Sequence, residues 1–177
     1  MWQKIRSGIW ETVKFIFITL VIVIPIRAYV AQPFIVSGAS MDPTFHNNEY
    51  LIVDELSYHL REPVRGEVVV FQYPKAPQTH FIKRIIGLPG ETIAIHGNEV
   101  TINGVKLNED YIKKPFDSEL PPTKLFDNEY FVMGDNRSVS LDSRAWGTVE
   151  KHFMTGRAFL RLFPLTKISL LPGQQNF

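Results

Sequence analysis

A serine and a lysine in two separate segments could together carry out nucleophilic catalysis. Ser40 lies in "VSGASMDPTF", residues 36–45, after a strand-like run and a turn that contains glycine. A serine at such a strand exit can present its hydroxyl and its own backbone N–H to a substrate carbonyl. Most serines beside glycine are ordinary loop residues, so Ser40 is a candidate nucleophile only if a second residue activates it.

Lys83 is the candidate for that second residue. It lies in "FIKRIIGLPGE", residues 81–91, where strand alternation places it on one face with Phe81 and Ile85, and places Arg84 on the other. One of the two cations must therefore be buried or shielded by apolar neighbours. A lysine in a strand is usually an exposed guard against edge pairing. Burial, however, lowers the pKa of an amine, and a general base would need its pKa roughly 3 below the free value of about 10.4.

A third segment, "GDNRSVSLDSRAWG" (residues 134–147), gathers polar side chains between a strand and an aromatic residue. Its acidic spacing does not match an EF-hand, which needs oxygen ligands at alternating positions and a central glycine. A solvated loop with an Asp142–Arg144 ion pair is the simplest alternative. The segment's polar and charged residues include Asp135, Asn136, Arg137, Ser140, Asp142, Ser143 and Arg144.

The composition excludes several other chemistries. The chain has 177 residues, 45% of them hydrophobic and 21% charged, and its net charge of +1 predicts no nucleic-acid surface. The absence of cysteine removes disulfides, thiolate metal sites and a cysteine nucleophile, and it fits an oxidising compartment. No metal-ligand spacing joins the five histidines, which are His46, His59, His80, His96 and His152.

The N-terminal segment is typical of a membrane anchor. The apolar run "FIFITLVIVIPI" covers residues 15–26, and residues 13–31 would reach roughly 28 Å at about 1.5 Å per residue, close to the thickness of a bilayer. Lys14 and Arg27 lie near the ends, where long side chains can reach the headgroups. A buried core helix is disfavoured because this run has no polar face.

A cleavable signal peptide is the other interpretation of this segment. Cutting after Ala31 would put Tyr29 at the third-last position, and cutting after Ala28 would put Ile26 there. Small residues are required at that position, so an uncleaved anchor is favoured. The positive-inside rule places residues 1–14 in the cytoplasm and everything after about residue 32 outside it.

Beyond the anchor the pattern predicts a mainly β domain of antiparallel strands. Seven runs rich in Val, Ile and Phe have strand lengths, at residues 49–56, 66–73, 80–88, 91–97, 99–104, 128–135 and 156–165. "LPGE" at 88–91 favours a type II turn, and "NG" at 103–104 favours a hairpin. We therefore expect an anchor over residues 1–32 and an extracytoplasmic domain over 33–177, with a proline-containing, cap-like insertion at about 105–127.

The three segments occur in a fixed order behind the anchor. They read G-x-S-M-x-P-T, then F-I-K-R-I-I-G-L-P-G-E, then G-D-N-R-…-S-x-D-S-R-x-x-G. This order resembles the type I signal peptidases (the leader peptidase family), in the short form found in Gram-positive and many other bacteria. The resemblance runs from the anchor to about Gly147; the 105–127 insertion and the C-terminal tail carry no such signal.

The resemblance implies a Ser/Lys dyad. Ser40 would be the nucleophile and neutral Lys83 the general base, with an acyl-enzyme intermediate that water then hydrolyses. No metal and no organic cofactor would be needed. The residues with implied supporting roles are Ser140, which would orient the lysine amine, Asp142 and Arg144, which would brace the site as an ion pair, and Asp135 and Arg137, which would be structural.

The oxyanion hole departs from one pattern in the family. Some members have a serine two residues before the nucleophile that donates its hydroxyl to the oxyanion, and here that position is Gly38. Ser37 is displaced by one residue, to the other face of a strand. The backbone N–H of Ser40 would then need a second donor that the sequence does not identify.

The implied substrates are signal peptides of exported preproteins, bound extended against strand edges near residues 34–37 and 80–83. The enzyme would share the cell membrane and its lipid with them, near the protein-export translocon. The expected pocket residues are Phe34, Val36, Gly38, Met41, Phe81 and Ile82.

Two other hypotheses remain open at this point. One is a membrane-anchored binding module that has the same fold but no catalysis, although the presence of both Ser40 and Lys83 argues against it. The other is a hydrolase with a Ser–His–Asp triad that uses His80 or His96. His80 precedes Lys83 by only three residues, so spacing alone does not exclude it.

Overall fold

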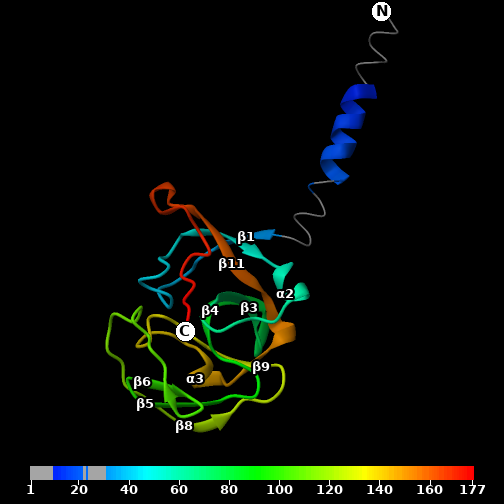
Figure 1. The fold of residues 1–177 in the computed structure, drawn as a ribbon. Helices are drawn as coiled ribbons and strands as arrows, with labels where there is room; N and C mark the ends of the chain where they lie inside the picture. Colours follow the sequence, from blue (N-terminus) through cyan, green and yellow to red (C-terminus); the bar gives the residue numbers. More distant parts are fainter. Residues whose placement is uncertain (1–9, 22, 24–30) are drawn as a thin grey trace, which may run out of the picture.

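The computed structural model describes residues 10–21, 23 and 31–177 (Figure 1). Residues 10–21 and residue 23 are helical. Across this described part of the chain, no helix is both long enough and apolar enough to cross a bilayer. The expected span of residues 13–31 lies partly outside the described residues, because residues 22 and 24–30 are not among them.

The rest of the chain is mainly β, as the sequence predicts. The described residues form an eight-stranded antiparallel sheet with the order β1-β2-β11-β3-β4-β9-β10, in which β12 also pairs with β11 (Figure 1). Its strands are β1 (Ala31–Ile35), β2 (Tyr50–Asp54), β3 (Val68–Tyr73), β4 (Ala76–Gly87), β9 (Glu129–Met133), β10 (Val149–Glu150), β11 (Met154–Phe163) and β12 (Ser169–Leu170). Each of the seven predicted apolar runs contains or overlaps a strand of this sheet or of the second one.

A second, four-stranded sheet has the order β7-β6-β5-β8 within the described residues. Its strands are β5 (Thr92–Gly97), β6 (Glu99–Ile102), β7 (Val105–Lys106) and β8 (Ser118–Lys124). The predicted hairpin at Asn103 and Gly104 is confirmed, since both residues have positive φ and join β6 to β7. The turn at 88–91 is also confirmed, because the Glu91 N–H donates to the Leu88 carbonyl and Gly90 has φ +79°.

The segment at 105–127 is more regular than an irregular cap. It contains β8, which pairs with β5 at the edge of the second sheet. Pro121 and Pro122 lie inside this strand and made a strand look improbable. An edge position and an irregularity in the pairing explain them, because the register with β5 passes from Leu120 to Thr123 without either proline, and prolines occur at edges and bulges.

Short helical turns connect the strands. They are α2 (Ser57–Leu60), α3 (Ser143–Trp146), η1 (Lys151–Phe153) and η2 (Leu165–Lys167). Asp142 is the N-cap of α3, where its side chain accepts a hydrogen bond from the Arg144 backbone N–H. The third polar segment therefore ends in a defined turn and is not a freely solvated loop.

Two clusters of buried apolar side chains hold the strand that carries Lys83 and the segment that carries Ser40 in place. One joins the two sheets, with Ile86 of β4 against Ile93 and Ile95 of β5. The other lies under the segment that carries Ser40 and contains Met41 and Phe45. Both of these side chains are essentially inaccessible to solvent. The neighbours of Ser40 are thus held by core packing, which gives an exposed loop a rigid base.

Leu125 tests the packing between the sheets. Its side chain is fully buried in the cluster that joins them, whereas the next residue, Phe126, is 72% exposed. We expect Leu125→Ala to lower the free energy of unfolding by about 2–5 kcal/mol, because truncation leaves a cavity. Phe126→Ala should change it by about 0.5 kcal/mol or less. Urea unfolding of both variants checks this; equal losses would contradict the assigned core.

Candidate active site

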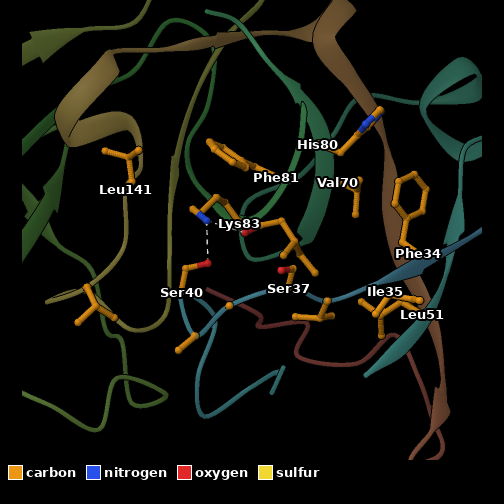
Figure 2. A pocket seen from close by; sticks show the side chains of 15 residues that line it. Phe34, Ile35, Ser37, Ser40, Leu51, Val70, His80, Phe81, Lys83 and Leu141 are labelled. Carbon is orange, nitrogen blue, oxygen red and sulfur yellow. Dashed lines mark hydrogen bonds between the residues drawn. The ribbon is translucent and has the colours of Figure 1, made fainter. Parts of the chain in front are cut away.

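Ser40 and Lys83 meet at one end of a pocket, pointing toward each other (Figure 2). The Lys83 Nζ lies 2.8 Å from the Ser40 Oγ and 3.0 Å from the Ile82 carbonyl, to which it donates. The two residues are 43 positions apart, so the fold alone brings them together. This distance allows a proton to pass between hydroxyl and amine.

The backbone before Ser40 turns away from β1 at a glycine. Gly38 has φ +87° and its N–H donates to the Asn47 side-chain oxygen at 2.9 Å. Its positive φ breaks the alternation of the strand. Ser37 therefore lines the same pocket as Ser40, which corrects the expectation that it would lie on the other face (Figure 2).

Lys83 is held in β4 beside Val69 of β3 and is 4% exposed. Burial lowers the pKa of Lys83 to about 8, against the opposite effect of the nearby Asp142 and Asp135 carboxylates. About a tenth of the amine is then neutral at pH 7, compared with a negligible fraction for a free lysine. The sequence predicts that one of the two cations, Lys83 or Arg84, is buried. In the structure both are buried, since Arg84 has no exposed surface.

Arg84 is the centre of a buried polar network behind the dyad. Its Nε donates to Asp135 Oδ1 at 2.8 Å, its Nη2 donates to Asp135 Oδ2, and both side chains have no exposed surface. Its Nη1 donates to the carbonyls of Gly66 and Gly173. Asp135 Oδ2 also accepts the Thr44 hydroxyl. Asp135 therefore connects the strand of Lys83 to the segment of Ser40.

Asp142 and Arg144 form the expected ion pair. The Nε and Nη2 of Arg144 donate to the two carboxylate oxygens of Asp142, each at 2.8 Å. Asp142 also accepts the Gly134 N–H at 3.0 Å. The neighbouring Asn136 ties this segment to the nucleophile, since its N–H donates to the Ser40 carbonyl and its side-chain amide donates to the Ala39 carbonyl.

Arg137 is buried and pairs with a residue of another segment. Its guanidinium pairs with both oxygens of Glu109, which comes from the segment at 105–127. Its Nε donates to the Gly134 carbonyl at 3.1 Å. Arg137 thus ties that segment to the strand end from which the third polar segment departs, and its structural role stays a prediction.

Ser140 does not make the contact expected of it in this geometry. Its Oγ is buried and has no hydrogen-bond partner among the residues that the structure describes. A Cβ on Gly134 would lie 2.2 Å from this Oγ and 2.4 Å from the Ser40 carbonyl oxygen. Only glycine allows Ser140 and the Ser40 backbone to approach each other so closely. The role of Ser140 in orienting the lysine stays a prediction.

The pocket beside the dyad has a volume of about 450 Å³ and a largely apolar wall (Figure 2). The expected residues Phe34, Val36, Gly38, Phe81 and Ile82 line it, whereas Met41 lies beneath in the core. Sequence reasoning did not assign the remaining lining residues Ile35, Ser37, Ala39, Leu51, Val70, His80, Val139 and Leu141 to this wall.

Neither candidate histidine contacts Ser40 among the residues that the structure describes. His80 lies in the pocket wall with its ring 5.5 Å from the Phe34 ring, and it makes no hydrogen bond to Ser40 within the described part of the chain. His96 is in the second sheet, where its 94% exposed side chain pairs with Glu119. The geometry therefore favours lysine over histidine as the base. Among the described residues no acidic and histidine side chains gather as a metal site.

Comparison with known proteins places the chain in one family. The family model "Signal peptidase, peptidase S26" matches residues 9–163. A protein named "Probable signal peptidase I-2" from Synechocystis sp. is 42% identical over 166 residues, which cover 91% of this chain and 76% of that protein. "Signal peptidase I" of Leptolyngbya laminosa is 39% identical, covering 95% and 86%, and "Signal peptidase I P" of Bacillus subtilis subsp. natto is 38% identical, covering 94% and 95%.

The buried amine makes a prediction about stability. The pKa of Lys83 is lower in the folded than in the unfolded chain, so the unfolded chain binds the proton more tightly. The folded state is therefore penalised below about pH 10.5, and in full below about pH 8. Lys83→Met should therefore be more stable than the parent at pH 7, by about 1–3 kcal/mol. The difference should shrink as the pH rises from 8 toward 10.5.

Urea unfolding at several pH values measures this difference. Lys106→Met is the matched control, because the Lys106 side chain is 63% exposed and forms only a surface ion pair with Glu99. Its unfolding free energy should stay within about 0.5 kcal/mol of the parent. A Lys83→Met variant that is less stable than the parent at pH 7 would show that burial of the Lys83 amine does not destabilise the folded state.

Proposed function

Because the chain belongs to the signal peptidase family, peptidase S26, we propose that it removes signal peptides from exported proteins with Ser40 as nucleophile and Lys83 as general base. The observation that carries this proposal is the 2.8 Å contact between Ser40 Oγ and Lys83 Nζ beside an apolar pocket. The lowered pKa of Lys83 supports it, because a general base must be neutral to accept a proton.

The reaction would proceed in two halves. Neutral Lys83 accepts the Ser40 proton while Oγ bonds to the scissile carbonyl carbon, and the ammonium then returns a proton to the departing amine of the mature protein as the peptide bond breaks. The signal peptide remains as an ester on Ser40. A water molecule gives its proton to Lys83 and attacks this ester. The bond between Oγ and the carbonyl carbon then breaks, which releases the peptide's carboxyl end, and the Lys83 ammonium returns the proton to Oγ to restore the serine hydroxyl and the neutral amine.

The backbone N–H of Ser40 is the first oxyanion donor in this proposal. In the described part of the chain it donates to no other group, so it is free to receive a developing negative charge. Its position is fixed from behind, because the Ser40 carbonyl accepts from the Asn136 N–H at 3.0 Å. Gly38 supplies no hydroxyl, so the second donor must come from another group at the pocket.

Two unpaired strand edges favour an extended peptide as the substrate. β1 is an edge strand of the main sheet, with β2 as its partner. Residues 80–83 of β4 pair with β3 on one side, and β4 pairs with β9 only from Arg84 onward in the described register. A peptide laid in the pocket between these edges can pair its backbone with both strands.

The lining of this pocket favours small apolar side chains before the scissile bond. Phe34 and Val36 of the β1 side and Ile82 of the β4 side line this pocket, with Leu51 and Val70 from neighbouring strands. A charged side chain placed there would lose its water without gaining a partner, at a cost of several kcal/mol. We therefore propose small, uncharged residues for this subsite.

Residues 13–31 form a membrane anchor in this proposal, with residues 1–14 in the cytoplasm and the domain over 33–177 outside it. The described helical residues support a lipid environment, because Trp10, Phe15 and Phe17 are each more than 60% exposed in the isolated chain. An anchor would keep the pocket at the membrane surface, where signal peptides are concentrated, and thus near lipid and the export translocon.

Cleavage of a precursor with an A-x-A site tests the dyad. In detergent or liposomes we expect the parent to cut after the last small residue and Ser40→Ala and Lys83→Ala to lose activity by about 10³-fold or more while staying folded. His80→Ala should keep a normal pH dependence. Full activity in Lys83→Ala would mean that another residue is the base, and an inert parent would favour a binding module.

The pH dependence of single-turnover cleavage gives a second test. Because only neutral Lys83 accepts the Ser40 proton, the rate should rise with pH through an apparent pKa of about 8 and level off above it. A rising limb centred below pH 7 would point to a histidine, and one centred near 10.5 would mean that the amine is not desolvated when it acts.

A further inference from the structure

The C-terminal tail, residues 171–177, lies close to the catalytic network although it carries no catalytic motif. Figure 1 shows this segment in red, ending at the point marked C. The Leu171 N–H donates to the Phe159 carbonyl at 2.7 Å, and the Gln175 N–H donates to the Gly66 carbonyl at 3.2 Å. A Cβ on Gly66 would lie 2.1 Å from the Gln175 carbonyl oxygen. The tail is therefore packed directly on the connection between α2 and β3, which contains Gly66.

Gly173 contacts the strand that carries Lys83 and also the segment that carries Ser40. Its carbonyl accepts a hydrogen bond from Nη1 of Arg84, the residue after Lys83. Its Cα faces Thr44, where an added Cβ would lie 2.4 Å from the Thr44 methyl and 3.3 Å from the Phe45 ring. One glycine of the tail therefore contacts both the base strand and the nucleophile segment.

Two aromatic side chains, Tyr111 and Phe177, form a pair beside the Arg84 guanidinium. The Arg84 guanidinium lies 4.3 Å from the centre of the Tyr111 ring, and that ring lies 6.1 Å from the ring of Phe177. Arg84 is thus enclosed by Asp135, by the tail carbonyl and by an aromatic face that the tail itself supports. A guanidinium held by four hydrogen bonds and a ring has little freedom to move.

We propose that Gly173 is a positioning residue for proteolysis, through which the tail holds Arg84 and Thr44 and so keeps Ser40 and Lys83 at reacting distance. This inference rests on the proposed function. The mechanical link is Asp135, which binds Arg84 and accepts the Thr44 hydroxyl. The electrostatic link is also Asp135, because a displaced Arg84 would leave this carboxylate less neutralised and favour the Lys83 ammonium.

Gly173→Ala tests the proposal with a matched control. Gly173 has φ +77° and Gly90 has φ +79°, so alanine is strained equally at both, but no atom lies within 4 Å of a Cβ at Gly90. We expect Gly173→Ala to lower kcat by about 10-fold or more, with KM changed by about 3-fold or less, because it disturbs the reacting groups and not the pocket. The rising limb of its pH–rate profile should move to higher pH. Gly90→Ala should leave kcat and the profile unchanged.

A rescue experiment separates positioning from general destabilisation. Thr44→Ser keeps the hydroxyl that Asp135 accepts and removes the methyl that an alanine at 173 would strike. With Thr44→Ser alone as the reference, adding Gly173→Ala should lower kcat by about 3-fold or less, far less than in the Thr44 background.

Two results would overturn the inference while leaving the proposed function intact. One is a Gly173→Ala variant whose kcat and pH profile match those of Gly90→Ala, and the other is an equal loss of kcat with and without the Thr44 methyl. A parent protein that cuts no A-x-A precursor would instead overturn the proposed function, and this inference with it.

Discussion

The Lys83 side chain is almost entirely shielded from solvent, and this loss of hydration governs the arrangement of charges around its amine. An ammonium ion in such a place is disfavoured, whereas a neutral amine beside a hydroxyl is not. Two carboxylates close to the amine, Asp135 and Asp142, act in the opposite direction. Each is paired with an arginine through two hydrogen bonds, Asp135 with Arg84 and Asp142 with Arg144. This pairing limits how far the carboxylates can restore the charge on Lys83.

The same constraint explains why the nucleophile is held from several sides. A neutral amine attracts the Ser40 hydroxyl less strongly than an ammonium would, so the serine must be placed by its surroundings. Met41 and Phe45 anchor its segment in the core, and Asn136 holds the Ser40 carbonyl. Arg161 donates to the Thr44 carbonyl at 2.7 Å and covers the Phe45 ring. These contacts come from several parts of the chain, which makes the site a product of the whole domain.

Local patterns in the sequence predicted what local physics determines. Strand lengths, the Asn103–Gly104 hairpin and the turn at Gly90 follow from side-chain alternation and from glycine's tolerance of positive φ. The burial of one cation, Lys83 or Arg84, could be predicted because the neighbours on both faces of the strand are apolar, but the burial of both could not. Ser37 departs from the prediction because alternation stops at Gly38. β8 cannot be predicted because its prolines suit an edge and an irregular pairing that only the folded sheet reveals.

The partners of Arg84 could not be predicted in this way. Asp135 is 51 residues from it and the Gly173 carbonyl is 89 residues away. No periodicity connects such positions, and a backbone carbonyl leaves no trace in residue type. Met41 is expected in the pocket but lies in the core, because the turn that contains Ser40 directs its side chain inward. Only the packed fold determines these contacts.

Direct titration of the Lys83 amine tests the central claim of a base made by burial. The full chain labelled with ¹³C at the lysine ε-carbons can be followed by NMR in detergent as the pH rises, with Lys83→Met used to assign the signal. We expect one lysine signal, absent from the variant, to titrate with a pKa of about 8 while exposed lysines titrate near 10.4. A Lys83 signal that titrates with the exposed lysines would contradict the account.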